Sequence, residues 1–168
     1  NGPSGFLYSN DPATAYPAYF VTTLHARVTN LAVPSAQTDE MIAQQVPLVP
    51  RDSDVVVYEG GANDLLYTGL SALSRIDAVV AAIRARAPRA KIVLVGVRYC
   101  AYRQPDEVRT WDERERDVAR TASATYIDLR TTFPSSDRHD WPDGLHPNEH
   151  GARSLAALIA QKIASAMR

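Results

Sequence analysis

The chain has 168 residues, enough for one domain with a hydrophobic core; 45% of them are hydrophobic and 22% charged, which excludes an intrinsically disordered chain. The formal net charge is −1, without a basic or acidic block, so nothing indicates binding to nucleic acid or to an anionic membrane surface. No apolar run reaches the roughly 20 residues that a membrane-spanning helix needs.

Short runs rich in β-branched residues alternate with longer helical patterns along the chain. Four of these runs predict strands: residues 27–33, 54–58, 91–97 and 124–129. The second and third runs are almost continuously apolar, which is typical of strands covered on both faces. The pattern therefore predicts a parallel sheet whose central strands are buried.

Three longer segments predict helices. Apolar residues recur every three or four positions over residues 70–83, which gives one buried stripe. Residues 107–120 form a charged amphipathic pattern, and we expect the charges from Arg109 to Arg120 to lie on a solvated face. A last helix is expected after Gly151. This alternation predicts an α/β fold, a three-layer α/β/α sandwich with a doubly wound parallel sheet, in a single domain of residues 1–168.

A polar turn, Gly60-Gly61-Ala62-Asn63-Asp64, follows the second predicted strand. Two glycines at the carboxyl end of a buried strand allow a sharp turn and the close approach of a ligand. Asn63 then projects an amide donor at the edge of the sheet where catalytic groups gather in such folds. Taken alone, the segment is equally well explained as an ordinary turn, because Gly, Asn and Asp all favour turns.

An acid and a base lie three residues apart before the last predicted helix, in Asp143-Gly144-Leu145-His146. Such a carboxylate can hold one imidazole nitrogen, fix the tautomer and stabilise the imidazolium that forms during acyl transfer. Trp141 and Pro142 stiffen the chain just before the pair. An isolated Asp-x-x-His would more often be a helix-capping turn. Its combination with Gly61-x-Asn63-Asp64 favours a catalytic acid–base pair over such a turn.

Together these segments resemble the SGNH hydrolases, the GDSL-like esterases and lipases, from about residue 14 to the end of the chain. The resemblance implies a flavodoxin-like fold and a serine esterase that needs no cofactor and no metal. It makes His146 the general base, Asp143 its orienting partner and Asn63 a side-chain donor to the oxyanion. The second oxyanion donor would be the backbone N–H of Ser35, at a position where the family normally has glycine.

The resemblance also implies small-molecule carboxylic esters as substrates. A small domain without an evident lid favours short acyl or acetyl esters, of which lipid and carbohydrate esters are two kinds that the family hydrolyses. The residues do not choose between them, because a fold does not determine a substrate. The likeness extends to secreted bacterial members and is compatible with a secreted or periplasmic protein.

The nucleophile is the difficult part, because the first block of the family is Gly-Asp-Ser after a central first strand. Either Gly2-Pro3-Ser4 is a degenerate first block with Ser4 as the nucleophile, or Asn1-Gly2 end the block and the serine precedes residue 1. The second alignment fits better, since proline in place of aspartate would be an odd substitution. We therefore expect the first strand and Gly-Asp-Ser to be absent from this chain, cut off or carried by a separate peptide.

Two other interpretations stay open. Residues His146 to His150 match the His-x-x-Glu-His pattern of a zinc peptidase, with Glu149 between the histidines, although Pro147 favours a first helical turn and places His146 before the helix. A catalytically degenerate fold used only for binding would account for Ser35 and for the missing Gly-Asp-Ser. We expect the two remaining histidines, His25 and His139, to be ordinary surface or core residues.

Overall fold

The computed structural model describes residues 16–99, 103–134, 137, 139–143 and 146–167. The chain divides into two compact units. Leu31–Thr132 form one of them, called the sheet unit below, and Asn1–Asn30 with Phe133–Arg168 form the other, called the terminal unit.

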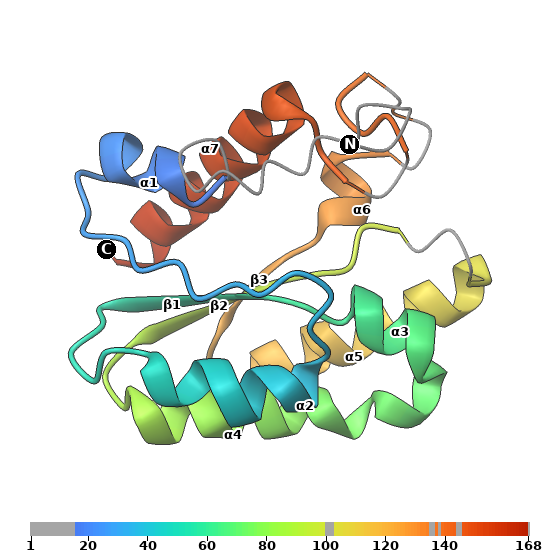
Figure 1. Ribbon diagram of the computed structural model, residues 1–168, viewed down its shortest axis with the longest axis horizontal. Coiled ribbons are helices and arrows are strands. Elements are labelled where there is room, and N and C mark those ends of the chain that lie inside the picture. The colour runs from blue at the N-terminus through green and yellow to red at the C-terminus, as the bar shows by residue number, and fades with distance from the viewer. Residues whose placement is uncertain (1–15, 100–102, 135–136, 138, 144–145, 168) are drawn as a thin grey trace. The chain divides into compact units, whose positions relative to one another are not determined.

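The sheet unit contains a parallel sheet whose three strands have the order β1-β2-β3 (Figure 1). The strands are β1 (Val55–Glu59), β2 (Lys91–Val95) and β3 (Thr125–Ile127). Val55 of β1 pairs with Lys91 of β2, and Val93 of β2 pairs with Thr125 of β3. The last four residues of β2 are buried, as its apolar run predicts. The predicted α/β fold with a parallel sheet is confirmed.

The strand predicted over residues 27–33 is wrong, because the structure assigns no strand there. A strand exists only where its backbone N–H and C=O groups pair with a neighbouring strand. Among the described residues β1 pairs with β2 alone, so residues 27–33 have no neighbouring strand with which to pair. Leu31 still packs against the buried cluster of Val49, Ala87 and Ala90.

Helices connect the strands, and α2, α3, α4 and α5 lie on one face of the sheet (Figure 1). The helices of the sheet unit are α2 (Thr38–Glu40), the π-helical η1 (Met41–Gln45), the 3₁₀-helical η2 (Val46–Leu48), α3 (Ala62–Tyr67), the 3₁₀-helical η3 (Gly69–Ala72), α4 (Ser74–Arg86), α5 (Pro105–Thr121) and α6 (Leu129–Thr132). The helices predicted over residues 70–83 and 107–120 are confirmed, although the first begins as a 3₁₀ turn.

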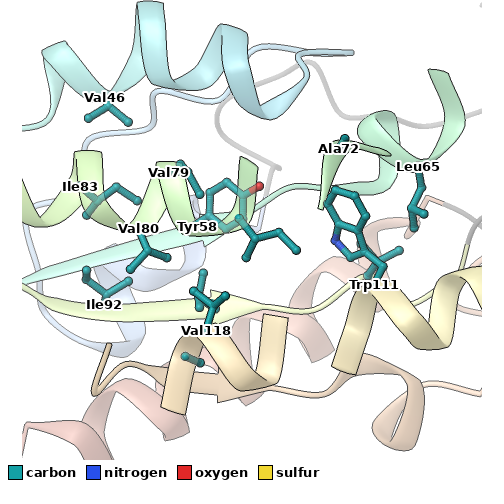
Figure 2. Packing of buried hydrophobic residues seen from close by; sticks show 14 of the residues in the cluster. Val46, Tyr58, Leu65, Ala72, Val79, Val80, Ile83, Ile92, Trp111 and Val118 are labelled. Atoms are coloured by element: carbon teal, nitrogen blue, oxygen red, sulfur yellow. The ribbon is translucent and has the colours of Figure 1, made fainter. Parts of the chain in front are cut away.

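A buried hydrophobic cluster joins the sheet to these helices (Figure 2). The buried stripe of α4 consists of Ile76, Val79, Val80 and Ile83, as the spacing predicts. The stripe packs with Tyr58 and Ile92 of the strands and with Val118 of α5. Each side chain of this size stabilises the fold by about 1.5–3 kcal/mol when it is buried. The cluster therefore packs β1 and β2 against α4 and α5.

The charged helix α5 departs from its prediction. Its arginines are exposed, as expected. Asp112 and Glu115 are instead 1% and 0% exposed, because they fall on the same face as the buried Val108 and Trp111. Asp112 accepts a hydrogen bond from the hydroxyl of Tyr126. The expectation of a wholly solvated charged face is wrong for these two acids.

The terminal unit contains α1 (Ala18–Thr23) and α7 (Glu149–Ala166), which contact each other. The helix predicted after Gly151 is confirmed and begins at Glu149, two residues before Gly151. Its buried face includes Leu155, Ile159 and Ile163. In the part of the chain that the structure describes, no helix has the length and apolar character needed to cross a membrane.

Candidate active site

Asn63 follows β1 directly, where the sequence predicts a polar turn. Gly61 precedes α3 with a φ of 91°, a left-handed value that favours glycine. A Cβ atom at Gly61 would lie 2.4 Å from Nε1 of Trp111, so a larger residue does not fit. This tight turn places Asn63 in the first turn of α3, at the carboxyl end of the strand.

The side-chain amide of Asn63 is tied to the turn that carries Ser35. Its Nδ2 donates to the carbonyl of Ala36 at 3.1 Å, and the amide carries a second N–H beside the one used there. The N–H of Ala36 donates to the carbonyl of Val33 at 3.3 Å and closes the turn. Proline at position 34 followed by a residue with positive φ is typical of a type II turn.

Ser35 has the backbone conformation that a glycine adopts at the lowest cost. Its φ is 64°, and an L-residue in this left-handed region loses about 1–2 kcal/mol relative to the right-handed one. The hydrogen bond that closes the turn uses the N–H of Ala36, so it does not consume the N–H of Ser35. Serine therefore fits a glycine position here at the cost of local strain.

Asp64 holds the segment that follows this turn. The side chain of Asp64 is fully buried, and its Oδ2 accepts from the backbone N–H and from Oγ1 of Thr38 at 3.0 and 2.8 Å. Its Oδ1 accepts from Arg75 at 2.8 Å. Because Oγ1 of Thr38 gives its proton to Asp64, it accepts from the Tyr58 hydroxyl at 2.7 Å, and burial raises the pKa of Tyr58 and keeps that hydroxyl protonated. Sequence reasoning gave Asp64 no role beyond its place in the motif.

Asp143 and His146 contact each other through two hydrogen bonds. Oδ1 of Asp143 accepts from the backbone N–H of His146 at 2.7 Å, and Oδ2 lies 2.6 Å from Nδ1 of the imidazole. Both side chains are partly buried, with 16% and 29% exposed. Trp141 is buried just before them and packs on Phe133 at 5.7 Å between ring centroids. The carboxylate thus fixes the imidazole with Nδ1 engaged, so proton transfer would use Nε2.

The chain before Asp143 is anchored to the start of α7. The backbone N–H of Asn148 donates to the carbonyl of Asp140 at 2.9 Å, and its side-chain amide donates to the carbonyl of His139 at 2.6 Å. A Cβ atom at Gly151 would lie 2.5 Å from the carbonyl oxygen of Asp140. The close approach of this segment to the helix therefore requires glycine at position 151.

Two histidines contact one carboxylate oxygen in the same region. Nδ1 of His139 and Nδ1 of His150 each lie 2.6 Å from Oδ1 of Asp140. Burial raises the pKa of Asp140, but the hydrogen bonds from the two imidazoles outweigh it and leave this pKa below its ordinary value. His139 is exposed, as expected of an ordinary surface histidine, but it is part of a cluster. The sequence does not signal this cluster, because its members come from a loop and a helix.

The zinc-peptidase pattern is not assembled. His146 lies before α7 and contacts Asp143, as Pro147 suggests. Within the described residues, one group of three potential metal ligands has its ligand atoms within 4.8 Å of one another: His139, Asp140 and His150. Since α7 begins at Glu149, His146 and His150 do not share one helix face, and the interpretation in which both histidines bind zinc from such a face is wrong.

The predicted site residues thus occur as two local arrangements. Asp143 and His146 contact each other in the terminal unit, and Asn63 contacts the turn of Ser35 in the sheet unit. Ser4 lies outside the described residues. Their roles in a reaction, and the identity of the nucleophile, stay predictions.

Several solved structures have a similar fold. One described as TesA has a TM-score of 0.77 and 18% identity, over 91% of this chain and 89% of the other. An acetyl xylan esterase, AlAXEase, has a TM-score of 0.68 and 19% identity, over 92% and 91% of the two chains. The lipase/acylhydrolase from Enterococcus faecalis has a TM-score of 0.67 and 20% identity, over 88% and 82%. At these identities the likeness establishes the fold alone.

The family follows from the sequence. No curated protein matches the chain. Residues 2–153 match the GDSL-like lipase/acylhydrolase family, and this span contains Ser35, Asn63, Asp143 and His146. Because the match takes in most of the chain, the protein belongs to the GDSL-like lipase/acylhydrolase family and is a carboxylic ester hydrolase.

Proposed function

We propose that the protein is a serine esterase that hydrolyses short acyl or acetyl esters through a Ser-His-Asp triad. The observation that carries the proposal is the doubly hydrogen-bonded pair of Asp143 and His146. One carboxylate oxygen holds the imidazole Nδ1 at 2.6 Å and the other holds the backbone N–H of the same residue at 2.7 Å. A carboxylate that orients an imidazole in this way is what a general base in acyl transfer needs.

The reaction follows from these roles. His146 takes the hydroxyl proton of the nucleophilic serine on Nε2 while the serine Oγ attacks the ester carbonyl, and Asp143 stabilises the imidazolium. The tetrahedral intermediate collapses when His146 returns the proton to the leaving alkoxide. A water molecule then attacks the acyl-enzyme with His146 again as the base, which releases the acid and restores the serine.

The oxyanion of the tetrahedral intermediate needs preorganised donors. We assign this role to the second N–H of the Asn63 amide and to the backbone N–H of Ser35. The hydrogen bond from Asn63 to Ala36 supports the assignment, since it orients the amide beside the turn of Ser35. Each such donor contributes about 2.7–4 kcal/mol to lowering the barrier.

The substrate class is the finer part of the proposal. The family name supports an acyl ester, and one structure of similar fold belongs to an acetyl xylan esterase. We favour acetyl and short acyl esters, on carbohydrate or lipid alcohols, over long-chain esters. Comparison of kcat/KM for p-nitrophenyl acetate, butyrate and palmitate tests this order directly.

The proposed activity is tested with His146→Ala. This variant should lower kcat for p-nitrophenyl acetate by about 10⁴-fold or more, because the base is lost. His25→Gln, at an exposed histidine, should hydrolyse the ester at the wild-type rate. A wild-type protein that is folded but inactive on all three esters would instead be a binding protein of hydrolase fold.

The nucleophile is located by covalent labelling. A fluorophosphonate reacts with an activated serine by forming a bond from Oγ to phosphorus and expelling fluoride. Peptide mass spectrometry of the labelled protein, as it is produced, identifies the modified serine as Ser4, as a serine on a preceding segment, or as one on a separate peptide. The His146→Ala variant should not be labelled, because the serine then lacks its base.

A further inference from the structure

Three ligand-type side chains converge near the start of α7, and ester hydrolysis assigns none of them a step. The ligand atoms of His139, Asp140 and His150 all lie within 4.8 Å of one another. The two Nδ1 atoms each lie 2.6 Å from the same oxygen, Oδ1 of Asp140. The two rings meet edge to face with 5.2 Å between their centroids. Both histidines therefore present the same ring nitrogen to one point.

The donor set is that of a transition-metal site. Imidazole nitrogen and carboxylate oxygen bind zinc at about 2.0–2.2 Å, so tetrahedral ligand atoms are about 3.3 Å apart. The distance from each Nδ1 to Oδ1 of Asp140 is shorter, at 2.6 Å. Both imidazole rings would therefore have to move away from Asp140 by about 0.7 Å to admit an ion of this kind. The side chains of His139 and His150 are 82% and 66% exposed, so nothing packed around them prevents that adjustment.

A hollow that is open to solvent adjoins the cluster. It is shallow, and its lining consists of His139, Asn148, Glu149, His150 and Arg153. The guanidinium of Arg153 pairs with Glu149 at 2.7 Å and lies 4.7 Å from the ring centroid of Tyr19. Since Glu149 offsets its positive charge, Arg153 does not exclude a cation from the hollow.

We propose that His139, Asp140 and His150 bind one divalent transition-metal ion of the zinc type. Each imidazole coordinates through Nδ1 and carries its proton on Nε2, and the fourth position faces the hollow. Two nitrogen ligands favour zinc, cobalt or nickel over calcium and magnesium, which prefer oxygen ligands. This site departs from the expectation that the protein has no metal, and it does not depend on the proposed esterase activity.

The ion would link the two sides of the segment that carries the acid–base pair. Asp140 precedes Asp143 and His146 in the chain, and His150 follows them. Bridging residues 140 and 150 restrains the chain between them, and an ion that binds only the folded protein also shifts the unfolding equilibrium. The metal would therefore stabilise the fold and position the pair, without contacting the ester.

The test uses the protein freed of any affinity tag and stripped of metal. Titration with Co²⁺ should give visible absorption bands that saturate at one equivalent, and Zn²⁺ should displace the cobalt and raise the melting temperature. His139→Ala and His150→Ala should each weaken Co²⁺ binding by at least about tenfold. His25→Gln, which removes a different exposed histidine, should bind as the wild type does.

Asp140→Asn distinguishes a metal site from a hydrogen-bonded clamp. The amide oxygen still accepts a hydrogen bond from an imidazole N–H, but it carries no charge and is a weaker metal ligand. Loss of Co²⁺ binding in this variant, with an unchanged circular dichroism spectrum, supports the site. The proposal is overturned if the wild type binds no stoichiometric Co²⁺ or Zn²⁺, or if all three cluster variants bind as the wild type does.

Discussion

The side-chain amide of Asn63 donates a 3.1 Å hydrogen bond to the backbone carbonyl of Ala36. The two residues are 27 positions apart, so the bond joins the first turn of α3 to the turn that precedes α2. The bond uses one of the two N–H donors of the amide. It fixes the plane of the amide and so the direction of the second N–H. Ala36 is adjacent to Ser35, so the two donors proposed for the oxyanion are coupled through one hydrogen bond.

Asn63→Ala should lower kcat for p-nitrophenyl acetate by about 10²–10³-fold, because one oxyanion donor is lost. KM should change little, since the donor acts on the transition state more than on the bound ester. Steady-state kinetics separate the two constants. An effect confined to KM, with kcat intact, would remove Asn63 from the oxyanion site. Thermal unfolding of the variant checks that the loss of the Ala36 contact has not unfolded the turn.

Ser35→Gly should relieve the backbone strain of the turn. The variant should raise the free energy of unfolding by up to about 1 kcal/mol, because glycine adopts a φ of 64° without cost but gains entropy in the unfolded chain. Its kcat/KM should stay at or above the wild-type value, because the backbone N–H is kept and a side chain that crowds the site is removed.

Ser123→Gly is the matched control for this change. Ser123 has a similar φ of 52° and lies just beyond the end of α5. It should gain stability in the same way and leave kcat/KM unchanged. A fall in activity in Ser35→Gly would mean that the serine side chain itself contributes to the site, which contradicts the assignment of a backbone donor only.

Much of this arrangement could be predicted from the sequence, because the relevant signals are local. The apolar runs predicted β1 and β2, and the glycines before Asn63 predicted the turn that the φ of Gly61 bears out. Asp143 and His146 are three residues apart, so a contact between them could be expected from spacing alone.

What could not be predicted depends on contacts between distant positions. The strand expected at residues 27–33 requires a pairing partner, which a propensity pattern does not report. Asp64 is buried against Thr38, 26 positions away, and the charge of Glu115 gave no hint that it faces the core. His139 and His150 meet on Asp140 only because Gly151 lets the loop approach α7.

Asp64→Asn should destabilise the sheet unit by about 2–4 kcal/mol. The buried carboxylate serves three donors, from Thr38 and Arg75, and an amide can accept on only one oxygen. Chemical denaturation measures the change.

Asp77→Asn is the matched control, because Asp77 also pairs with an arginine, Arg114, but both side chains are nearly half exposed. Its effect should be below about 1 kcal/mol, and equal effects in both variants would contradict the role given to Asp64.

Glu115 should make the stability of the protein depend on pH. Burial raises its pKa well above the ordinary value of 4.5, so the folded protein holds this proton more tightly than the unfolded chain does. The free energy of unfolding therefore contains a contribution that is complete below pH 4.5 and is lost as the pH rises toward the folded-state pKa.

Glu115→Gln lacks a titrating group, so the difference in unfolding free energy between the variant and the wild type should shift in the variant's favour from pH 4.5 to pH 8. Urea denaturation across this range measures the difference, and Glu113→Gln, at an exposed neighbour on α5, should show little change with pH. A pH-independent difference for Glu115→Gln would mean that the carboxyl group ionises equally easily in both states.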